Sequence, residues 1–312
     1  MQEHISPQID RQPMHGASFD VEDYRQILRL RYQADSGEVS QSFAQDMRAL
    51  CHLLDVTSTR ATFFVTGTVA QQRPQWLQQW QAQGHEIACH GWDHRPVWSM
   101  TPAEFAEDIR KSAAAIADAI GQMPRGYRAP IFSIRWDTQW ALEVLADQGF
   151  VYDSSIVPVR TKRYGINGAP RVPGMYQLSG GRRIVEIPLP VDVVCGRTRP
   201  VGGGGYFRLW PLSIIRRAVV RHQQQDRPFV LYAHPDELGG QRFKAADLAR
   251  GLPQRLKATI LSIKSNMGRP RMPGIIAALL REFHFVPLIE LAKTWENHGA
   301  TSLLEPPRTG LC

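Results

Sequence analysis

Residues 85–94 read His-Glu-Ile-Ala-Cys-His-Gly-Trp-Asp-His, and this stretch decides how the chain is expected to fold. Its first half, residues 85–89, contains the apolar run Ile87 to Cys89 and predicts a short strand. A helix predicted over Pro74–Gln83 precedes it and stops at Gly84, a natural residue for the left-handed turn that ends a helix. His90 and His94 then follow at the carboxyl end of the predicted strand.

The same alternation of strand and helix continues in both directions. Further strands are predicted at Ala61–Val65, Gly126–Arg128, Phe150–Tyr152, Arg183–Ile187 and Phe229–Tyr232. Further helices are predicted at Tyr24–Leu30, Phe43–Leu54, Pro102–Gly121, Asp137–Gln148 and Pro211–Gln225. Alternating strands and helices are typical of parallel βαβ units, so we expect an α/β fold, either a barrel or a doubly wound sheet.

Two stretches interrupt the alternation. Residues 157–182 and 195–208 are rich in Gly, Pro and Arg and are predicted to form long loops. The second contains four glycines, Gly202 to Gly205, without the Gly-Lys-Ser/Thr ending of a phosphate-binding loop. These glycines predict either a flexible loop or one that approaches another backbone closely.

The chain is predicted to hold one folded domain over residues 16–298, with a flexible leader over 1–15 and a tail over 299–312. The leader is polar and carries no apolar core of a secretory signal, and no run of about 18 apolar residues predicts a membrane span. The 4 cysteines form no C-x-x-C pair, which favours reduced thiols and a cytoplasmic protein.

Composition places the chain among ordinary globular proteins, with 43% hydrophobic and 21% charged residues. The formal net charge is +8, but the basic residues are scattered and no run of five or more occurs. No nucleic-acid-binding motif accompanies them, so a solvated basic surface is the favoured interpretation and nucleic acid is not an expected partner.

Five polar residues follow the ends of predicted strands: Asp20, His90, Arg128, Asp153 and His234. In parallel α/β folds the active site lies at the carboxyl ends of the strands. Polar side chains gathered at that edge are therefore the pattern of an enzyme.

The pair His90 and His94 has the spacing of two metal ligands. Two imidazoles and one carboxylate, with positions left for water, are a common catalytic site for zinc. Taken alone the spacing is a weak signal, since two structural histidines produce it as well. The carboxylate has to come from elsewhere, and residues 20–23, Asp-Val-Glu-Asp, are the obvious donors, although they also suit an acidic cap of the helix that begins at Tyr24.

Four clusters, taken in order, resemble the polysaccharide deacetylase family (carbohydrate esterase family 4). They are Phe-Asp-Val-Glu-Asp at 19–23, Cys-His-Gly-Trp-Asp-His at 89–94, Arg-Gly-Tyr-Arg-Ala-Pro at 125–130 and Leu-Tyr-Ala-His-Pro at 231–235. The chain is similar to a subgroup associated with exosortase and exopolysaccharide gene clusters, through Tyr-Asp-Ser-Ser-Ile at 152–156 and Gly-Gly-Gly-Tyr-Phe-Arg at 203–208. The resemblance covers about residues 17–240 and becomes thin after His234.

The resemblance implies a distorted (β/α) barrel of mostly parallel strands in a single domain, with a divalent metal, most often Zn²⁺. His90 and His94 would be two of its ligands. The family's motif has adjacent aspartates, whereas Val21 and Glu22 separate the two aspartates of this chain. Asp23 is the ligand that we expect, and Glu22 is the alternative because strand alternation would place it beside Asp20.

The resemblance also implies roles for the remaining polar residues. Asp20 would be the general base and His234 the acid that protonates the leaving amine. Arg128 would orient Asp20, and Asp153 would orient His234.

The implied reaction is removal of the acetyl group from an N-acetylated sugar, in a polysaccharide or its lipid-linked precursor. A lipid-linked partner would suit peripheral association with a membrane. Two aromatic side chains near the histidines, Trp92 and Trp98, are candidates for stacking on sugar faces. The alternatives are hydrolysis of another C–N amide, in a formamido sugar or a cyclic ureide, or an inactive relative that only binds glycans.

Overall fold

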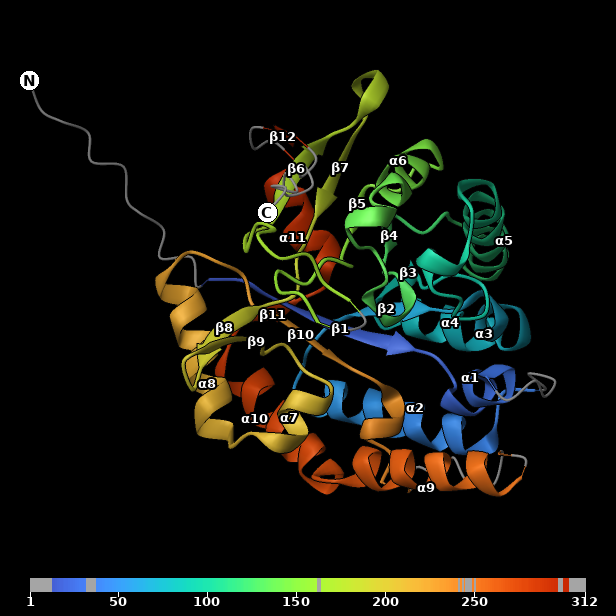
Figure 1. Cartoon of the computed structure of the whole chain (residues 1–312), viewed down its shortest axis with the longest axis vertical. Coiled ribbons are helices and arrows are strands. Elements are labelled where there is room, and N and C mark those ends of the chain that lie inside the picture. Colours follow the sequence, from blue (N-terminus) through green and yellow to red (C-terminus); the bar gives the residue numbers. More distant parts are fainter. Residues whose placement is uncertain are drawn as a thin grey trace, which may run out of the picture.

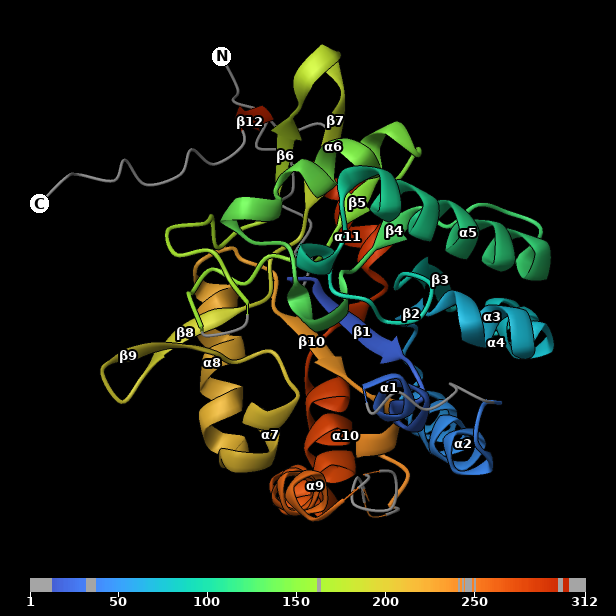
Figure 2. The same ribbon diagram turned by 45° about the vertical axis from the view of Figure 1, so that its right-hand side comes forward.

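The computed structural model describes residues 13–31, 38–161, 164–240, 242, 244, 249, 251–296 and 300–302 of the chain. Its centre is a curled sheet with helices packed around it (Figures 1 and 2). The strands follow the order β10-β1-β2-β3-β4-β5-β7-β6-β12, with β11 also paired to β1. The prediction of a distorted (β/α) barrel with mostly parallel strands is confirmed.

The strands that carry the predicted site residues, together with their neighbours β2 and β7, all run parallel. They are β1 (His15–Val21), β2 (Thr62–Val65), β3 (Glu86–Cys89), β4 (Gly126–Tyr127), β5 (Tyr152–Asp153), β7 (Arg183–Glu186) and β10 (Val230–Ala233). Two strands extend this sheet beyond β7: β6 (Gly174–Gln177), which is antiparallel to β7, and β12 (Ala300–Ser302). The short β11 (Phe285–Val286) lies parallel to β1, and β8 (Val191–Val194) and β9 (Arg197–Pro200) form a separate hairpin.

Helices alternate with these strands along the chain. They are α1 (Tyr24–Arg31), α2 (Gln41–Val56), α3 (Gly67–Gln72), α4 (Pro74–Ala82), α5 (Pro102–Ile120), α6 (Trp140–Asp147), α7 (Gly205–Leu209), α8 (Leu212–Gln224), α9 (Leu252–Asn266), α10 (Met272–Glu282) and α11 (Leu288–Trp295). The start of α5 has the predicted cap, in which Thr101 accepts from the N–H of Glu104 and the Glu104 carboxylate accepts in return. Within the described residues no helix is long and apolar enough to cross a bilayer.

Strand alternation divides the buried side chains into two layers. Phe19 and Phe63 point outward into the core beneath the helices, whereas their neighbour Phe64 points inward with Tyr232. Helix α11 closes the inner layer at the end where the strands begin, because the N–H of Leu288 donates to Thr62 at 2.7 Å, at the first residue of β2. The carboxyl ends of the strands lie at the opposite end of the sheet.

The two predicted long loops contain regular structure, so this prediction was wrong in part. Residues 157–182 include β6, and 195–208 include β9 and most of α7. The strand β6 forms by antiparallel pairing with β7, from Gly174 opposite Glu186 to Gln177 opposite Arg183. A strand fixed by its partner rather than by its own alternating pattern is hard to recognise from sequence.

The predicted ends of the domain are described only in part. Residues 1–12 of the expected leader, and residues 299 and 303–312 of the expected tail, lie outside the described residues. Ala300–Ser302, placed in the tail, form β12 and pair with Met175 to Gln177 of β6.

The glycine-rich segment approaches another backbone closely, as one of the two predicted alternatives required. Gly203 forms a bridge to Tyr232 of β10 and has a φ of +153°, a region that is essentially restricted to glycine. A Cβ atom at this position would collide with the carbonyl oxygen of Tyr232. The segment therefore lies directly against the strand that carries His234.

This contact predicts that Gly203→Ala lowers the free energy of unfolding by about 3 kcal/mol, through backbone strain and overpacking. Gly196→Ala is the matched control, because Gly196 also has a positive φ, +70°, but no heavy atom lies within 4 Å of its added Cβ. The control should lose only about 1 kcal/mol. Urea unfolding followed by circular dichroism measures both, and equal losses would contradict the close approach.

Candidate functional site

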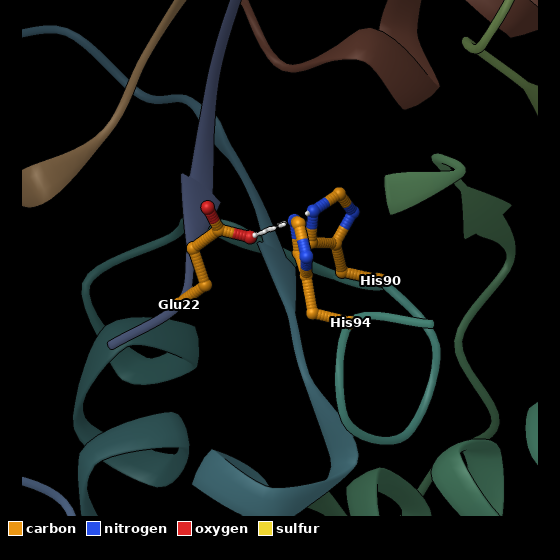
Figure 3. A group of neighbouring side chains, drawn as sticks. All are labelled: Glu22, His90 and His94. Atoms are coloured by element: carbon orange, nitrogen blue, oxygen red, sulfur yellow. Dashed lines mark ion pairs between the residues drawn. The ribbon is translucent and has the colours of Figure 1, made fainter. Parts of the chain in front are cut away.

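Three side chains converge at the carboxyl ends of β1 and β3. The Oε2 atom of Glu22 lies 2.7 Å from Nε2 of His94 and 3.2 Å from Nε2 of His90. One donor atom from each residue lies within 4.8 Å of the other two (Figure 3). Glu22 follows β1 directly, and the histidines belong to the loop after β3, so two neighbouring strand ends build the group.

The orientation of His90 is set by its backbone and by its second ring nitrogen. Its N–H donates to the carbonyl of Val65 at 3.0 Å, and its Nδ1 lies 2.8 Å from the carbonyl oxygen of Arg128. A carbonyl can only accept, so Nδ1 carries the proton and Nε2 presents a lone pair to the group. This is the usual arrangement of a metal-binding histidine.

The loop from His90 to His94 is held by the helices behind it. The carboxylate of Asp108 accepts from the N–H of Trp92 at 2.9 Å, and the Ser112 hydroxyl donates to the carbonyl of Gly91 at 2.8 Å. Gly91 and His94 both have positive φ, +73° and +67°. These turns bring the two rings to a centroid distance of 5.4 Å.

The carboxylate beside the histidines is Glu22, and the expectation of Asp23 is corrected. The Asp23 oxygens accept from the N–H groups of Arg25 at 3.0 Å and Ser40 at 2.8 Å, so this side chain fixes the turn into α1 and the start of α2. The reason is alternation, because residues 20 and 22 share the inner side of β1 and its extension, whereas residue 23 points elsewhere.

The three residues suit a divalent metal by chemistry and by environment. Glu22 and His90 are buried, and among the described residues the polar partners of Oε2 of Glu22 are the Nε2 atoms of His90 and His94. Burial would raise the pKa of Glu22, but the imidazoles of His94, His90 and His234 outweigh it and hold this pKa well below its usual value. A buried carboxylate kept ionised beside two imidazole nitrogens matches the ligand set of catalytic zinc sites.

Arg128 lies next to Asp20, as expected. Its Nη1 donates to Oδ1 of Asp20 at 2.8 Å and to the Ser18 hydroxyl at 2.9 Å, and its Nε donates to the carbonyl of Ser154 at 3.0 Å. The guanidinium is completely buried, with its Cζ atom 4.2 Å from the centre of the Phe64 ring. One oxygen of Asp20 is thereby fixed, and the other faces the site.

His234, at the end of β10, lies beside both carboxylates of β1. Its Nε2 atom is 3.5 Å from Oε1 of Glu22 and 3.9 Å from Oδ2 of Asp20. Burial would lower the pKa of His234, but the carboxylates of Glu237, Glu22 and Asp20 raise it to about 10. The ring is therefore a protonated donor that faces the same space as Asp20.

The partner of the other ring nitrogen of His234 is Glu237, so the expectation that Asp153 orients this histidine is corrected. Oε2 of Glu237 lies 3.4 Å from Nδ1 and accepts from the His234 N–H at 3.1 Å. The two residues stand three apart in a short helical turn, which closes a capping box. Arg208 of α7 lies beside the same carboxylate, with its Nε 3.6 Å from Oε1 of Glu237.

Asp153 lies in the wall of the site instead. It accepts from the hydroxyl of Ser155 at 2.6 Å and from its N–H at 3.1 Å, and the sheet places Glu186 directly opposite. Burial raises the pKa of Asp153 and of Glu186. Two buried carboxyl groups side by side share a proton, so this pair is suited to holding the strands around Arg128 rather than to orienting His234.

Glu237 and Arg208 were missed in the sequence. The His-x-x-Glu spacing after the strand was a usable signal for Glu237, whereas nothing local marks Arg208 as its partner. Of the predicted sugar-stacking residues, Trp92 is covered by Lys111, whose Nζ lies 3.6 Å from the ring centre. Trp98 is 46% exposed, and the Cζ atom of Arg135 lies 5.7 Å from its ring centre.

Two family profiles match the chain in succession. The profile of polysaccharide deacetylase matches residues 35–152, and that of DUF3473, a domain of unknown function, matches residues 154–293. Among curated proteins, a chitooligosaccharide deacetylase of Bradyrhizobium sp. (strain ANU 289) is 37% identical over 87 residues. That match covers 28% of this chain and 37% of the relative, so the chain corresponds to little more than a third of the relative's length.

Solved structures share the fold over nearly the whole chain. A putative polysaccharide deacetylase from Mycobacterium smegmatis superposes with a TM-score of 0.66 at 19% identity, covering 97% of both chains. PuuE allantoinase superposes with a TM-score of 0.60 at 14% identity, covering 95% of this chain and 96% of its own. At these identities the likeness establishes the fold alone.

The position of the carboxylates predicts different outcomes for two neighbouring substitutions. Glu22→Gln should weaken Zn²⁺ binding by about 100-fold or more, because it removes the charged oxygen beside the imidazoles. Asp23→Asn, the matched control, should bind Zn²⁺ as the unchanged protein does. Titration against a chromophoric chelator measures both affinities, and loss of binding in the Asp23 variant alone would reverse the assignment.

Proposed function

Because residues 35–152 match the polysaccharide deacetylase family, we propose that the chain hydrolyses the acetamide of an N-acetylated sugar, in a polysaccharide or its lipid-linked precursor. One observation carries the proposal: Nε2 of His234 and Oδ2 of Asp20 lie 3.9 Å apart, beside the group formed by Glu22, His90 and His94 at one edge of the sheet. A carboxylate and a protonated imidazole facing one space can respectively take a proton and give one.

Glu22, His90 and His94 would hold a divalent metal, for which Zn²⁺ fits the two nitrogens and one oxygen best. When bound, such a metal supplies a Lewis acid that polarises the amide carbonyl and makes water more acidic. The protein's own part is to fix these ligands, which the contacts of His90 with Arg128 and of Trp92 with Asp108 support.

Asp20 acts in the proposal as the general base. Its Oδ1 is tied to Arg128, so Oδ2 is the oxygen available to accept a proton from the attacking water. Arg128 fixes the position of this carboxylate from the buried side and leaves its other edge open to the site. The carboxylate cannot rotate away without leaving a buried guanidinium unpaired, which is costly.

His234 acts as the general acid toward the leaving amine. The carboxylates of Glu237 and Asp20 raise the pKa of His234 and favour its protonated form, with Nε2 carrying the proton toward the site. Glu237 holds the ring from behind through Nδ1. We therefore assign Glu237 as the residue that positions the acid.

Replacing the base is the first test of this function. Asp20→Asn should retain Zn²⁺ and lose about 100- to 10,000-fold in turnover, because the amide cannot accept the proton. Asp118→Asn, an exposed position on α5, is the matched control and should keep full activity. The assay is acetate release from a panel of N-acetylated chitooligosaccharides and lipid-linked sugars after Zn²⁺ loading.

The product separates the remaining alternatives. Unaltered acetate release by Asp20→Asn would remove Asp20 from the role of base. Release of formate from a formamido sugar, or opening of a cyclic ureide, without acetate release would move the activity to another C–N bond. Saturable glycan binding without any product would identify a binding protein.

The role of Glu237 predicts an effect that depends on the leaving group. Glu237→Gln should lower kcat for the N-acetylated sugar by about 10- to 100-fold with little change in KM, because His234 loses its orienting carboxylate. Hydrolysis of an aryl acetate, whose leaving group needs little protonation, should fall far less. Equal losses on both substrates would indicate general structural damage, and Glu107→Gln on the exposed face of α5 serves as the control.

A further inference from the structure

Helix α9 exposes large apolar side chains along its length. In both views it lies at the lower edge of the molecule (Figures 1 and 2). The exposed members, with their fractional exposures, are Leu252 (84%), Leu256 (65%), Ile260 (46%), Ile263 (63%) and Met267 (51%), the last directly after the helix. We call these five residues the α9 stripe.

The spacing puts the stripe on a single face. Successive members are four, four, three and four residues apart, which confines them to an arc of about 80° around the helix axis. The opposite face holds the helix to the rest of the protein, through the fully buried Ala258 and through Leu261, which pack with Leu28. The helix therefore buries a small residue and leaves the larger apolar ones in water, the reverse of what folding alone favours.

The charged side chains of α9 itself are all positive. Residues 252–266 contain no Asp or Glu, whereas Arg255, Lys257 and Lys264 are exposed. At 100° per residue, Lys257 and Lys264 lie on one side of the stripe and Arg255 on the other. An apolar face bordered by basic side chains complements the surface of an anionic bilayer, where acyl chains lie beneath negative headgroups.

We propose that α9 docks in the plane of an anionic lipid membrane, with the stripe inserted and the three basic side chains at headgroup level. With 15 residues the helix is about 22 Å long, which suffices for in-plane contact. A second copy of this chain suits the face less well, because two such helices would bring their basic side chains together.

Docking would place the membrane near the side of the candidate site that holds His234, the proposed general acid. A cavity of about 910 Å³ opens between α9 and the segment after β10, and Glu237, Ile263 and Met267 are among its lining residues. The carboxylate that holds His234 and two members of the stripe therefore border one space. The docking proposal itself rests on α9 alone and is independent of the reaction.

Vesicle co-sedimentation of the full chain tests the proposal. The unchanged protein should bind vesicles of phosphatidylcholine containing phosphatidylglycerol, and bind pure phosphatidylcholine much less. Leu256→Ser with Ile260→Ser should weaken partitioning about tenfold or more, and Lys257→Gln with Lys264→Gln should do so on the anionic vesicles. Met123→Ser removes an equally exposed apolar side chain away from α9 and should have no effect.

Light scattering after size exclusion tests whether a second copy of this chain, rather than a membrane, covers the α9 stripe. A dimer that Leu256→Ser with Ile260→Ser converts to a monomer, without vesicle binding, would assign the stripe to self-association and overturn the proposal. Equal binding to both vesicle types, or none to either, would overturn it as well. Far-ultraviolet circular dichroism of each variant confirms that a lost interaction does not reflect unfolding.

Discussion

The buried ion pair between Arg128 and Asp20 is the interaction on which the arrangement of the site depends. A completely buried guanidinium must be paired, because removing one partner of such a pair costs about 3–5 kcal/mol. Arg128 meets this requirement by bonding at once to Ser18 and Asp20 of β1 and to Ser154 after β5. These bonds fix β1 relative to the far strands, and Glu22, two residues beyond Asp20, is thereby held opposite the histidines.

The site is divided between segments that match different families. The polysaccharide deacetylase segment, 35–152, carries His90, His94 and Arg128, whereas the DUF3473 segment, 154–293, carries His234 and its partners. Both carboxylates that face the site from β1 precede either segment. Parallel pairing of β10 with β1, from Gly16 opposite Val230 to Phe19 opposite Ala233, joins the three parts, so the proposed base and acid meet across one strand pairing.

Local pattern predicted the fold, and the ordered set of four motifs drew attention to the histidines, but neither identified the partners of the site residues. Cap residues, turn glycines and apolar spacing predicted most central strands and helices, and the polar residues at strand ends followed from parallel topology. The prediction of Asp23 as the carboxylate beside the histidines failed because the choice between Glu22 and Asp23 depends on where the side chains of the strand stop alternating. The prediction that Asp153 orients His234 failed because the partner of Asp153 is Glu186, which comes from a strand 33 residues further along the chain. Arg208 reaches Glu237 only through the tertiary fold, which no short pattern encodes.

The balance of charge explains why Glu22 is the natural carboxylate for a cation. Three carboxylates surround His234, and two of them have guanidinium partners, Arg128 for Asp20 and Arg208 for Glu237. In the part of the chain that the structure describes, no Arg or Lys lies within 4.0 Å of Glu22, which is paired only with imidazoles. His90 and His94 are neutral when they ligate a metal, so the protonated His234, which Asp20 and Glu237 share, is then the one cationic side chain of the described residues beside this carboxylate. A divalent cation would supply that missing charge, which is why the proposal gives Glu22, rather than Asp20, to the metal.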